Sequence, residues 1–391
     1  MQLFNGDSLE VLKGVEDNSI DALVTDPPYG LSATKSAQIV ECLTAWTQGE
    51  TWTPKGKGFM NKAWDASVPP PELWREVYRV MKPGAYGAVF AGTRTQDLMS
   101  ISLRLAGFEI RDTIMWVYGS GFPKSHNVAL GIDKLKGHPN RGEAIPTASR
   151  YQASDTEEKN KLTSNPVEAY EAKSTESMDW QGWGTALKPA YEPIILIRKP
   201  PKGTVAQNVL AHGVGGINID ATRIKGKPWK WGTQTDIKGG GFGSNRPSDG
   251  NILRKNVEGG FNGRWPANIM LDEVSAEMLD AQSGGASRFF YTSKASKKER
   301  EAGLMHREAE TRERKNTHPT VKPLDLMRYL VRLITPPNGV ILDPFAGSGS
   351  TLCGAVQQGF DYIGIERDAE YVEIARARVE HWKREKESRL I

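Results

Sequence analysis

Apolar runs alternate with helically spaced hydrophobic positions along the first 118 residues of the chain. Strands are predicted at residues 20–25, 85–91 and 108–118. Helices are predicted at residues 71–81 and 95–106. The Lys82-Pro83-Gly84 sequence is expected to break the chain before the second strand. Strands that alternate with helices are typical of a doubly wound, mostly parallel sheet, so we expect an α/β fold with helices on both faces.

The same alternation resumes near the end of the chain. Hydrophobic residues at helical spacing predict a helix at 323–334, with proline in its first turn. An apolar strand at 340–342 runs into a glycine turn and another helix, and a further strand is expected at 362–365. We expect the strand that ends at Thr25 to lie beside the strand that ends at Leu342, because ligands of such sheets bind where the strand order reverses.

The middle of the chain breaks this pattern. A strand is predicted at 191–198, but the residues before it are polar and show no apolar period. The predicted organisation is a first half of the α/β domain at 1–120, a partly flexible polar insertion at 121–185, a returning strand at 186–199, an irregular inserted region at 200–316 and a second half of the α/β domain at 317–391.

Positive charge is concentrated in the irregular region. Residues 198–264 contain twelve Lys or Arg, four Asp or Glu and fourteen Gly. The aromatic residues interleaved with these bases are Trp229, Trp231, Phe242, Phe261 and Trp265. Cations that neutralise phosphates, rings that stack on bases and a flexible backbone are what a nucleic-acid-binding segment requires. A glycine-rich surface loop with solvated charges explains the same segment equally well.

The amino-acid composition limits the expected cellular location and the kinds of site. Cys42 and Cys353, the two cysteines, cannot form a disulfide framework, and they lack the paired spacing of a zinc site. No stretch approaches the roughly 18 apolar residues that would span a bilayer, and the first residues do not resemble a signal peptide. We therefore expect a cytoplasmic protein without a metal centre or a membrane partner.

A glycine turn at 343–351, D-P-F-A-G-S-G-S-T, follows the strand at 340–342. It lacks the lysine of a phosphate-binding P-loop, and Leu352 stands where a dinucleotide-binding turn has its third glycine. The remaining candidate is a small adenosine ligand whose tail carries an amine and a carboxylate. Asp343 would bind the amine, and Glu366 would bind the ribose hydroxyls. The plainer alternative is a turn that only reverses the chain.

A second turn, D-P-P-Y at 26–29, follows the strand at 20–25. By itself it could be a proline-rich turn that ends a strand. Together with the turn at 343–349, it resembles the S-adenosylmethionine-dependent DNA amino-methyltransferases, in the motif order of their beta class and in a phage- and prophage-like branch. The other matching segments are N-G-D-S-L-E-V-L at 5–12, H-P-T-V-K-P at 318–323 and G-F-D-Y-I-G-I-E-R-D at 359–368.

This resemblance implies a Rossmann-like methyltransferase fold, S-adenosyl-L-methionine as cofactor and double-stranded DNA as partner. Residues 1–120 would form the catalytic half, 200–316 the target-recognition region and 317–391 the cofactor-binding half. A homodimer and a partner restriction endonuclease are compatible with the resemblance, which decides neither. The leading function is methylation of the N6 amine of adenine in a flipped-out base.

The chemistry of the D-P-P-Y turn follows from the weakness of an exocyclic amine as a nucleophile. The Asp26 carboxylate and the Pro27 carbonyl would accept hydrogen bonds from the amine and localise its lone pair. Pro27 and Pro28 would fix the backbone, and Tyr29 would offer a face on which the extruded base stacks.

Further site residues follow from the resemblance. Asp7 would reach the adenine of the cofactor, although an acid that caps a helix starting near Ser8 is the alternative. Thr320 and Lys322 would lie against its methionine part, although Lys322 could be a solvated lysine. The complete set of expected cofactor-binding residues is Asp7, Thr320, Lys322, Asp343, Pro344, Phe345, Gly347, Gly349, Ser350, Thr351 and Glu366.

Several alternatives stay open. N4-cytosine methylation uses the same chemistry, but that group tends to have Ser at the position of Asp26, and methylases of RNA or of protein glutamine tend to have Asn. A further hypothesis is a DNA-binding protein without catalytic activity. The two intact turns argue against this hypothesis. We expect His318 to position other groups rather than to act as a base. Trp116 and Tyr118 could line a base pocket or simply pack in the core.

Overall fold

A computed structural model describes residues 1–31, 35–54, 65–119, 125–138, 170–225, 263–293, 297–304, 316–318 and 320–388. The chain divides into two compact units, one of residues 1–119 and 191–391 and the other of residues 120–190. Most of the basic segment at 198–264, including four of its five interleaved aromatic residues, lies outside the described residues.

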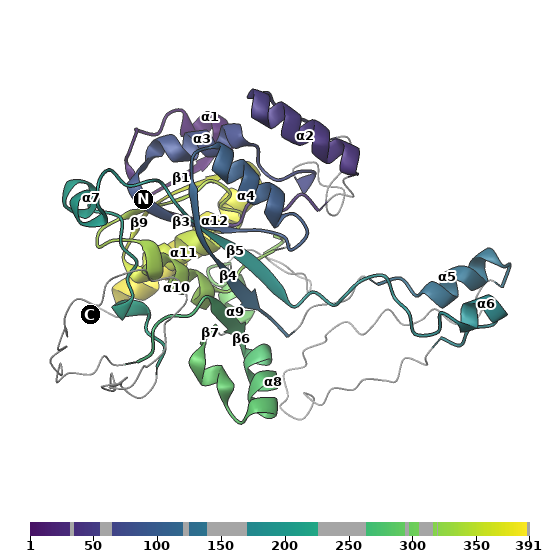
Figure 1. Ribbon diagram of the computed structural model, residues 1–391. Helices are drawn as coiled ribbons and strands as arrows, with labels where there is room; N and C mark the ends of the chain where they lie inside the picture. The colour runs from purple at the N-terminus through teal and green to yellow at the C-terminus, as the bar shows by residue number, and fades with distance from the viewer. Residues whose placement is uncertain are drawn as a thin grey trace, which may run out of the picture. The chain divides into compact units, whose positions relative to one another are not determined.

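The larger unit is built on a sheet to which the described residues contribute nine strands (Figure 1). The strands are β1 (Gln2–Asn5), β2 (Ile20–Thr25), β3 (Met81–Phe90), β4 (Glu109–Val117), β5 (Tyr191–Arg198), β6 (Ile269–Asp272), β7 (Tyr291–Ser293), β8 (Val340–Asp343) and β9 (Asp361–Glu366). Their order across the sheet is β1-β9-β8-β2-β3-β5-β4-β6-β7. Neighbouring strands are parallel except at β5, which runs antiparallel to both β3 and β4. The expected mostly parallel α/β sheet is therefore confirmed.

Helices cover both faces of this sheet. They are α1 (Ser8–Leu12), α2 (Ser36–Gln48), α3 (Pro71–Val80), α4 (Gln96–Leu105), α7 (Val205–His212), α8 (Glu273–Ser283), α9 (Lys297–Glu301), α10 (Leu324–Ile334), α11 (Ser350–Gln358) and α12 (Ala369–Ser388). Side chains alternate between the two faces of each strand. In β2, Ala22 and Val24 pack in a core with α10 and α11, whereas Leu23 packs in a second core with α1, α3 and α4.

The strand order reverses between β2 and β8. Ala22 pairs with Ile341 and Leu23 with Leu342 in parallel register, which confirms that the two strands are neighbours. From β8 the chain continues through α11 to β9 on one side, and from β2 it continues through α2 and α3 to β3 on the other. Ligands of such sheets bind at the carboxyl ends of the strands beside the reversal, and both predicted turns begin there.

The expected break at Lys82–Gly84 is wrong, because these residues lie inside β3. Ile20 pairs with Met81 but Ala22 already pairs with Tyr86, so the extra residues of β3 form a bulge. Gly84 takes the left-handed conformation, with a φ of +82°, and its N–H donates to the carbonyl of Lys199 on the β5 side. Proline and glycine can occupy a strand at such a bulge.

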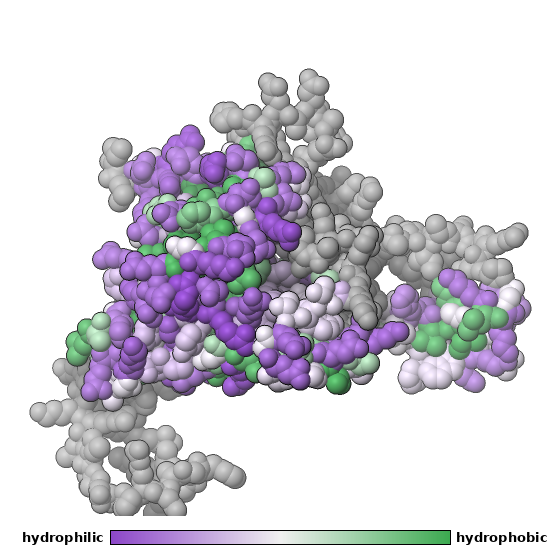
Figure 2. Space-filling model, turned by 90° about the horizontal axis from the view of Figure 1, so that it is seen from above, coloured by the Kyte–Doolittle hydropathy of each residue, from purple (hydrophilic) through white to green (hydrophobic). Residues whose placement is uncertain are grey.

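The smaller unit contains α5 (Val128–Leu135) and α6 (Thr175–Met178). Asp133, which is buried, accepts hydrogen bonds from the Tyr170 hydroxyl and from the N–H groups of Lys173 and Ser174. Figure 2 shows hydrophobic side chains gathered on this unit, and its exposed apolar residues are Leu135, Met178, Trp180, Trp183 and Leu187.

The helices within the described ranges include none that is long and apolar enough to cross a membrane.

Candidate active site

The D-P-P-Y turn leaves the carboxyl end of β2 and is held by two other segments. Asp65 accepts hydrogen bonds from the N–H groups of Tyr29 (2.9 Å) and Gly30 (3.1 Å). The Thr95 hydroxyl donates to the Tyr29 carbonyl at 2.6 Å. Gly30 has a φ of +64°, and a Cβ there would lie 2.7 Å from the backbone nitrogen of Val68. These contacts fix the path of the turn.

Four side chains meet at this turn and form what we call the acid–lysine cluster: Asp26, Tyr29, Glu192 and Lys322. The Lys322 Nζ lies 2.8 Å from Asp26 Oδ2 and 3.1 Å from Glu192 Oε2. The Tyr29 hydroxyl lies 2.8 Å from Asp26 Oδ1 and 2.8 Å from Glu192 Oε2. Lys322 also donates to the Tyr29 hydroxyl oxygen at 3.1 Å. One cation and one hydroxyl are thus shared by two carboxylates.

Burial makes these charges strongly dependent on one another. The side chain of Lys322 is 7% exposed, that of Asp26 18% and that of Glu192 23%. Burial raises the pKa of Asp26, while the Lys322 ammonium opposes that rise. Burial alone would lower the pKa of Lys322, but the carboxylates of Asp26 and Glu192 outweigh it and raise that pKa. The solvated-lysine interpretation of Lys322 is therefore wrong.

The second turn leaves the carboxyl end of β8, next to β2. Asp343 is 2% exposed, and its Oδ1 accepts a hydrogen bond from the Thr25 hydroxyl at 2.7 Å. The N–H of Phe345 donates to the same oxygen at 3.1 Å. Burial raises the pKa of Asp343 to about 6, although hydrogen bonds from Thr351 and Thr25 oppose the rise. Because Thr25 precedes Asp26, this hydrogen bond joins the two predicted turns directly.

Glu366 ends β9 and holds the glycine turn from the other side. Its carboxylate accepts hydrogen bonds from the N–H groups of Gly347 and Asp368, both at 2.8 Å. Burial raises the pKa of Glu366, and these backbone N–H groups oppose the rise. The carboxylates of Asp343 and Glu366 therefore both lie at the carboxyl edge of the sheet, beside the start of α11.

The two glycines of this turn have a packing reason as well as a conformational one. Gly347 and Gly349 have φ values of +51° and +79°. A Cβ on Gly347 would lie 2.7 Å from His318 Nε2, and one on Gly349 would lie 2.9 Å from the Cβ of Ala375 in α12. Close approach of a ligand is thus not needed to explain glycine at either position.

The remaining expected cofactor residues differ in exposure. Asp7 is exposed and accepts a hydrogen bond from the N–H of Leu9 at 3.0 Å, so it caps α1 as the alternative predicted. Thr320 is exposed, and its N–H donates to His318 Nδ1 at 3.3 Å. Pro344, Ser350 and Thr351 are buried, whereas the ring of Phe345 packs edge-on against Trp74 with centroids 6.2 Å apart. These geometries leave the cofactor roles of the residues as predictions.

His318, Trp116 and Tyr118 lie around these turns. Burial and the charges of Lys322 and Arg378 lower the pKa of His318 to about 4, so its ring is neutral at pH 7. The rings of Trp116 and Tyr118 are 5.4 Å apart, and Trp116 packs against the core that contains α10. Trp116 pairs with Glu192 in the register of β4 and β5.

Sequence reasoning missed three residues of this site: Glu192, Asp65 and Arg378. Arg378 of α12 is fully buried, and its Nη1 donates to the carbonyl (2.5 Å) and the hydroxyl (3.0 Å) of Ser348 in the glycine turn. For Glu192 a signal was present. A strand that runs antiparallel starts at the edge where its parallel neighbours end, so the acid near the start of β5 lies level with the end of β3.

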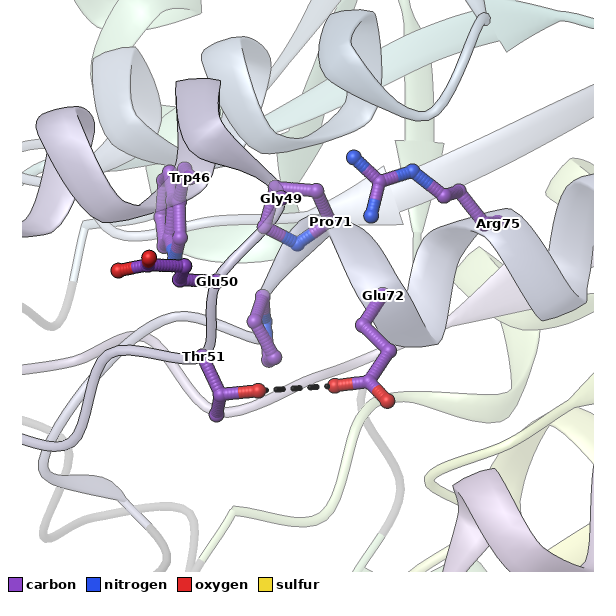
Figure 3. Close-up of a pocket in the computed structure, with 8 residues that line it drawn as sticks. Trp46, Gly49, Glu50, Thr51, Pro71, Glu72 and Arg75 are labelled. Carbon is purple, nitrogen blue, oxygen red and sulfur yellow. Dashed lines mark hydrogen bonds between the residues drawn. The ribbon is translucent and has the colours of Figure 1, made fainter.

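A small pocket lies elsewhere in the larger unit, between the end of α2 and the start of α3 (Figure 3). Its lining includes Trp46, Pro71 and Arg75, and a hydrogen bond of 3.2 Å joins the Thr51 hydroxyl to Glu72. The residues of the two turns are not among those that line it, so we place the candidate site at the sheet edge instead.

Known proteins resemble this chain over almost its whole length. The type II methyltransferase M.HindIII of Haemophilus influenzae is 24% identical over 393 residues, which cover 94% of this chain and 91% of that protein. The M1.HpyAVI–SAM complex aligns with a TM-score of 0.41 at 15% identity, covering 97% of this chain and 98% of its own. The PvuII DNA methyltransferase, which is cytosine-N4-specific, aligns with a TM-score of 0.45 at 15% identity, covering 96% of this chain and 85% of its own.

The family is established by a match of a different kind. The N6_N4_Mtase family model, which describes DNA methylases, matches residues 20–377. This match includes the D-P-P-Y turn after β2, the returning strand β5 and the glycine turn after β8. Because it spans most of the chain, the protein belongs to this family and is a DNA methyltransferase of the N6/N4 type.

Proposed function

We propose that this enzyme transfers a methyl group from S-adenosylmethionine to the N6 amine of adenine in a base that has left the DNA duplex. The observation that carries the proposal is the buried link between the two turns. Asp26 follows Thr25, and the Thr25 hydroxyl is bonded to Asp343 at the head of the glycine turn. A carboxylate that faces an amine and a turn that holds a methyl donor would thus share one crevice.

The residues around the glycine turn fit this cofactor. S-adenosylmethionine supplies a methyl group on a positively charged sulfonium and carries an amine and two ribose hydroxyls. Asp343 and Glu366 offer carboxylates for the amine and the hydroxyls. The first N–H groups of α11 offer partial positive charge for the ligand's carboxylate, and Ser350 and Thr351 in the first turn of α11 stay predicted contacts. Asp7, Thr320, Pro344 and Phe345 stay predicted contacts of the same ligand.

At the catalytic turn, the chain's own residues would prepare the base. Asp26 and the Pro27 carbonyl accept hydrogen bonds from the amine, which favours a tetrahedral nitrogen with a localised lone pair. Pro27 and Pro28 fix the direction of that carbonyl. The Tyr29 ring is held at its hydroxyl by the acid–lysine cluster, which presents it in a fixed orientation for stacking on the base.

The choice of adenine over cytosine rests on Asp26. Serine, which tends to occupy this position in N4-cytosine methylases, has no negative charge with which to polarise an amine. The neighbouring Lys322 keeps the Asp26 carboxylate compensated inside the protein. N4-cytosine methylation is the alternative, because the same hydrogen bonds could serve either amine.

Double-stranded DNA is the expected substrate, with target recognition in residues 200–316. The described part of this region offers one exposed aromatic residue, Trp265, which is 66% exposed. The guanidinium of Arg223 lies 5.6 Å from the centre of its ring. The Arg223 side chain is only 10% exposed and is paired with Asp220, whereas the exposed ring of Trp265 is suited to stacking on bases. The exposed ring supports a role of this region at the DNA surface.

Analysis of DNA from cells that express the enzyme tests the proposal. The host should lack other DNA methyltransferases, and the same host with an empty vector is the control. We expect nucleoside mass spectrometry to find N6-methyladenine, and sequencing that detects modified bases to find it in one recurring sequence context. N4-methylcytosine in its place would contradict the assignment to adenine, and unmodified DNA would contradict the proposed activity.

A further inference from the structure

We propose that Glu192 is a positioning residue for methyl transfer, which shares Lys322 and Tyr29 with Asp26 and so keeps the Asp26 carboxylate available to the target amine. This inference rests on the proposed function. Glu192 lies outside both turns and would act on the base only through its neighbours.

The fold delivers Glu192 to this point from the opposite strand direction. β5 is antiparallel to β3, and the carbonyl of Pro193 accepts a hydrogen bond from the N–H of Ala91, just beyond the end of β3. Alternation along β5 turns Glu192 to the same face as Ile194, which packs in the core with α10. Lys322 lies two residues before α10 begins. The carboxylate and the ammonium therefore meet because of the sheet topology.

The sharing of charge follows from the distances. One ammonium lies 2.8 Å from Asp26 and 3.1 Å from Glu192, so a single positive charge is shared by two carboxyl groups. Without the Glu192 charge, the Lys322 ammonium would form an ion pair with Asp26 alone, and that pair would be neutral. An ammonium held by one carboxylate weakens that carboxylate as an acceptor for a further donor, because it withdraws negative charge from the same oxygens.

The Tyr29 hydroxyl adds a second shared contact. It has a single proton and lies 2.8 Å from acceptors on both Asp26 and Glu192, so it donates fully to one of them at a time. With Glu192 as its acceptor, Asp26 Oδ1 is free to accept the N–H of the amine. Loss of Glu192 would leave both oxygens of Asp26 engaged, one by Lys322 and one by Tyr29.

Few other titratable groups face this cluster among the described residues. His318 lies close enough to Lys322 for the ammonium to lower its pKa, and its ring is neutral at pH 7. Tyr118 lies close enough for the Glu192 charge to raise its pKa, and Asp343 close enough for the Asp26 charge to raise its own. Neither group separates Glu192 from Asp26, so Glu192 is the neighbouring negative charge with the largest effect in raising the pKa of Asp26. Removal of that charge should lower the pKa of Asp26.

The test compares Glu192→Gln with the wild type and with Glu192→Asp. Glutamine keeps the shape and the neutral hydrogen bonds but removes the charge. We expect kcat for DNA methylation to fall about tenfold or more, while KM for S-adenosylmethionine stays the same. In a plot of kcat against pH, the acid limb, where the rate falls as pH decreases, should move to lower pH by about one unit. Aspartate should recover part of the rate and return the acid limb towards the wild-type position.

Glu109→Gln is the matched control. Glu109 pairs with Arg198 at 2.7 Å, also between β4 and β5 but at the other end of β5, and it lies outside the catalytic and cofactor sites. This variant loses an ion pair of the same sheet, and we expect its kcat and acid limb to match the wild type. A positioning role for Glu192 would be contradicted by a wild-type rate in Glu192→Gln, or by a rate loss in which the acid limb does not move.

A second readout separates this inference from the proposed function. In the protein labelled with ¹³C at aspartate carboxyls, the Asp26 signal is assigned by its loss in Asp26→Asn. We expect its titration midpoint to lie lower in Glu192→Gln than in the wild type, whether or not DNA is methylated. An unmoved midpoint would overturn the role of Glu192, whereas inactive wild-type enzyme would overturn only the proposed function.

Discussion

Asp26 and Asp343, the acids that begin the two turns, are largely buried, and each has a partner that offsets part of the cost of its charge. Lys322 and Tyr29 contact Asp26, and the Thr25 hydroxyl contacts Asp343. A carboxylate in a dry environment destabilises the fold unless its ionised form is compensated. Asp343, with a pKa raised to about 6, is compensated only in part. The ionised form of Asp343 therefore lowers the stability of the folded protein.

Asp343→Asn tests this effect. The folded state holds the carboxyl pKa at about 6, above the ordinary value of 3.8, so the ionised form costs stability above pH 6 and costs nothing below about pH 4. We expect the variant to increase the free energy of unfolding by about 1–3 kcal/mol at pH 7.5, and the difference from the wild type to vanish near pH 4. Denaturant unfolding of both proteins at pH 7.5 and at pH 4 measures this difference in the free energy of unfolding.

The same variant should bind S-adenosylmethionine more weakly, because the asparagine amide lacks the negative charge that would attract the amine of the cofactor. Isothermal titration calorimetry provides this measurement. A variant that is less stable than the wild type at pH 7.5 would mean that the hydrogen bonds of the carboxylate, rather than its burial, dominate its energetics.

Residue types alone were enough to predict the acids at the ends of parallel strands, but not their partners. Asp26, Asp343 and Glu366 each follow an apolar run, and the strand-end rule places them together. Asp65 acts from a loop, and Glu192 stands at the start of a strand whose direction the sequence does not state. The pairing of Lys322 with Asp26 depends on where α10 begins relative to β2, which only the three-dimensional fold determines.

At the scale of elements, strong hydrophobic periodicity was the reliable signal. Ile20–Thr25 and Tyr191–Arg198 form strands with the predicted bounds, and the predicted helix at 323–334 corresponds to α10. β1 was not predicted, since it has only four residues and is mostly exposed at the edge of the sheet. The sequence of the bulge in β3 predicts a break instead, because proline and glycine give the same local signal in both cases.

The glycine turn gives a prediction at this scale. Gly349→Ala would place a Cβ at a φ of +79° and 2.9 Å from the Cβ of Ala375. Left-handed backbone costs a non-glycine residue about 1–2 kcal/mol, and the contact with α12 adds to this cost. We therefore expect a loss of about 1–3 kcal/mol in the free energy of unfolding, together with weaker cofactor binding.

Gly216→Ala is the control for this substitution. Gly216 lies in the same unit, and a Cβ there would meet nothing within 4 Å. Its free energy of unfolding should stay within about 0.5 kcal/mol of the wild type. Equal stability of the two variants in denaturant unfolding would show that the packing of Gly349 against α12 is not required.

At the scale of the whole molecule, residues 1–119 and 191–391 build the unit that contains the sheet, and residues 120–190 are inserted into its sequence. β4 and β5 are antiparallel neighbours, and Val117 pairs with Tyr191 at the end where the chain leaves for the smaller unit. A short hairpin loop could join these two residues. The smaller unit is therefore an insertion that the sheet does not need for its connectivity.

Replacement of residues 120–190 by a loop of about five glycine-rich residues tests this organisation. We expect the shortened chain to unfold in one cooperative transition and to bind S-adenosylmethionine with an affinity within about threefold of the full chain. Circular dichroism and calorimetry measure the two properties. A chain that no longer folds cooperatively would mean that the larger unit depends on the insertion.

The central claim is that Asp26 acts on the target amine while the neighbouring glycine turn holds the methyl donor. Asp26→Asn tests it most directly, because the amide keeps the shape of the side chain and Glu192 still compensates Lys322. With S-adenosylmethionine binding and DNA methylation measured on the same preparation, we expect binding within about threefold of the wild type and turnover reduced by about a thousandfold. Turnover close to that of the wild type, or a loss of cofactor binding as large as the loss of turnover, would contradict the claim.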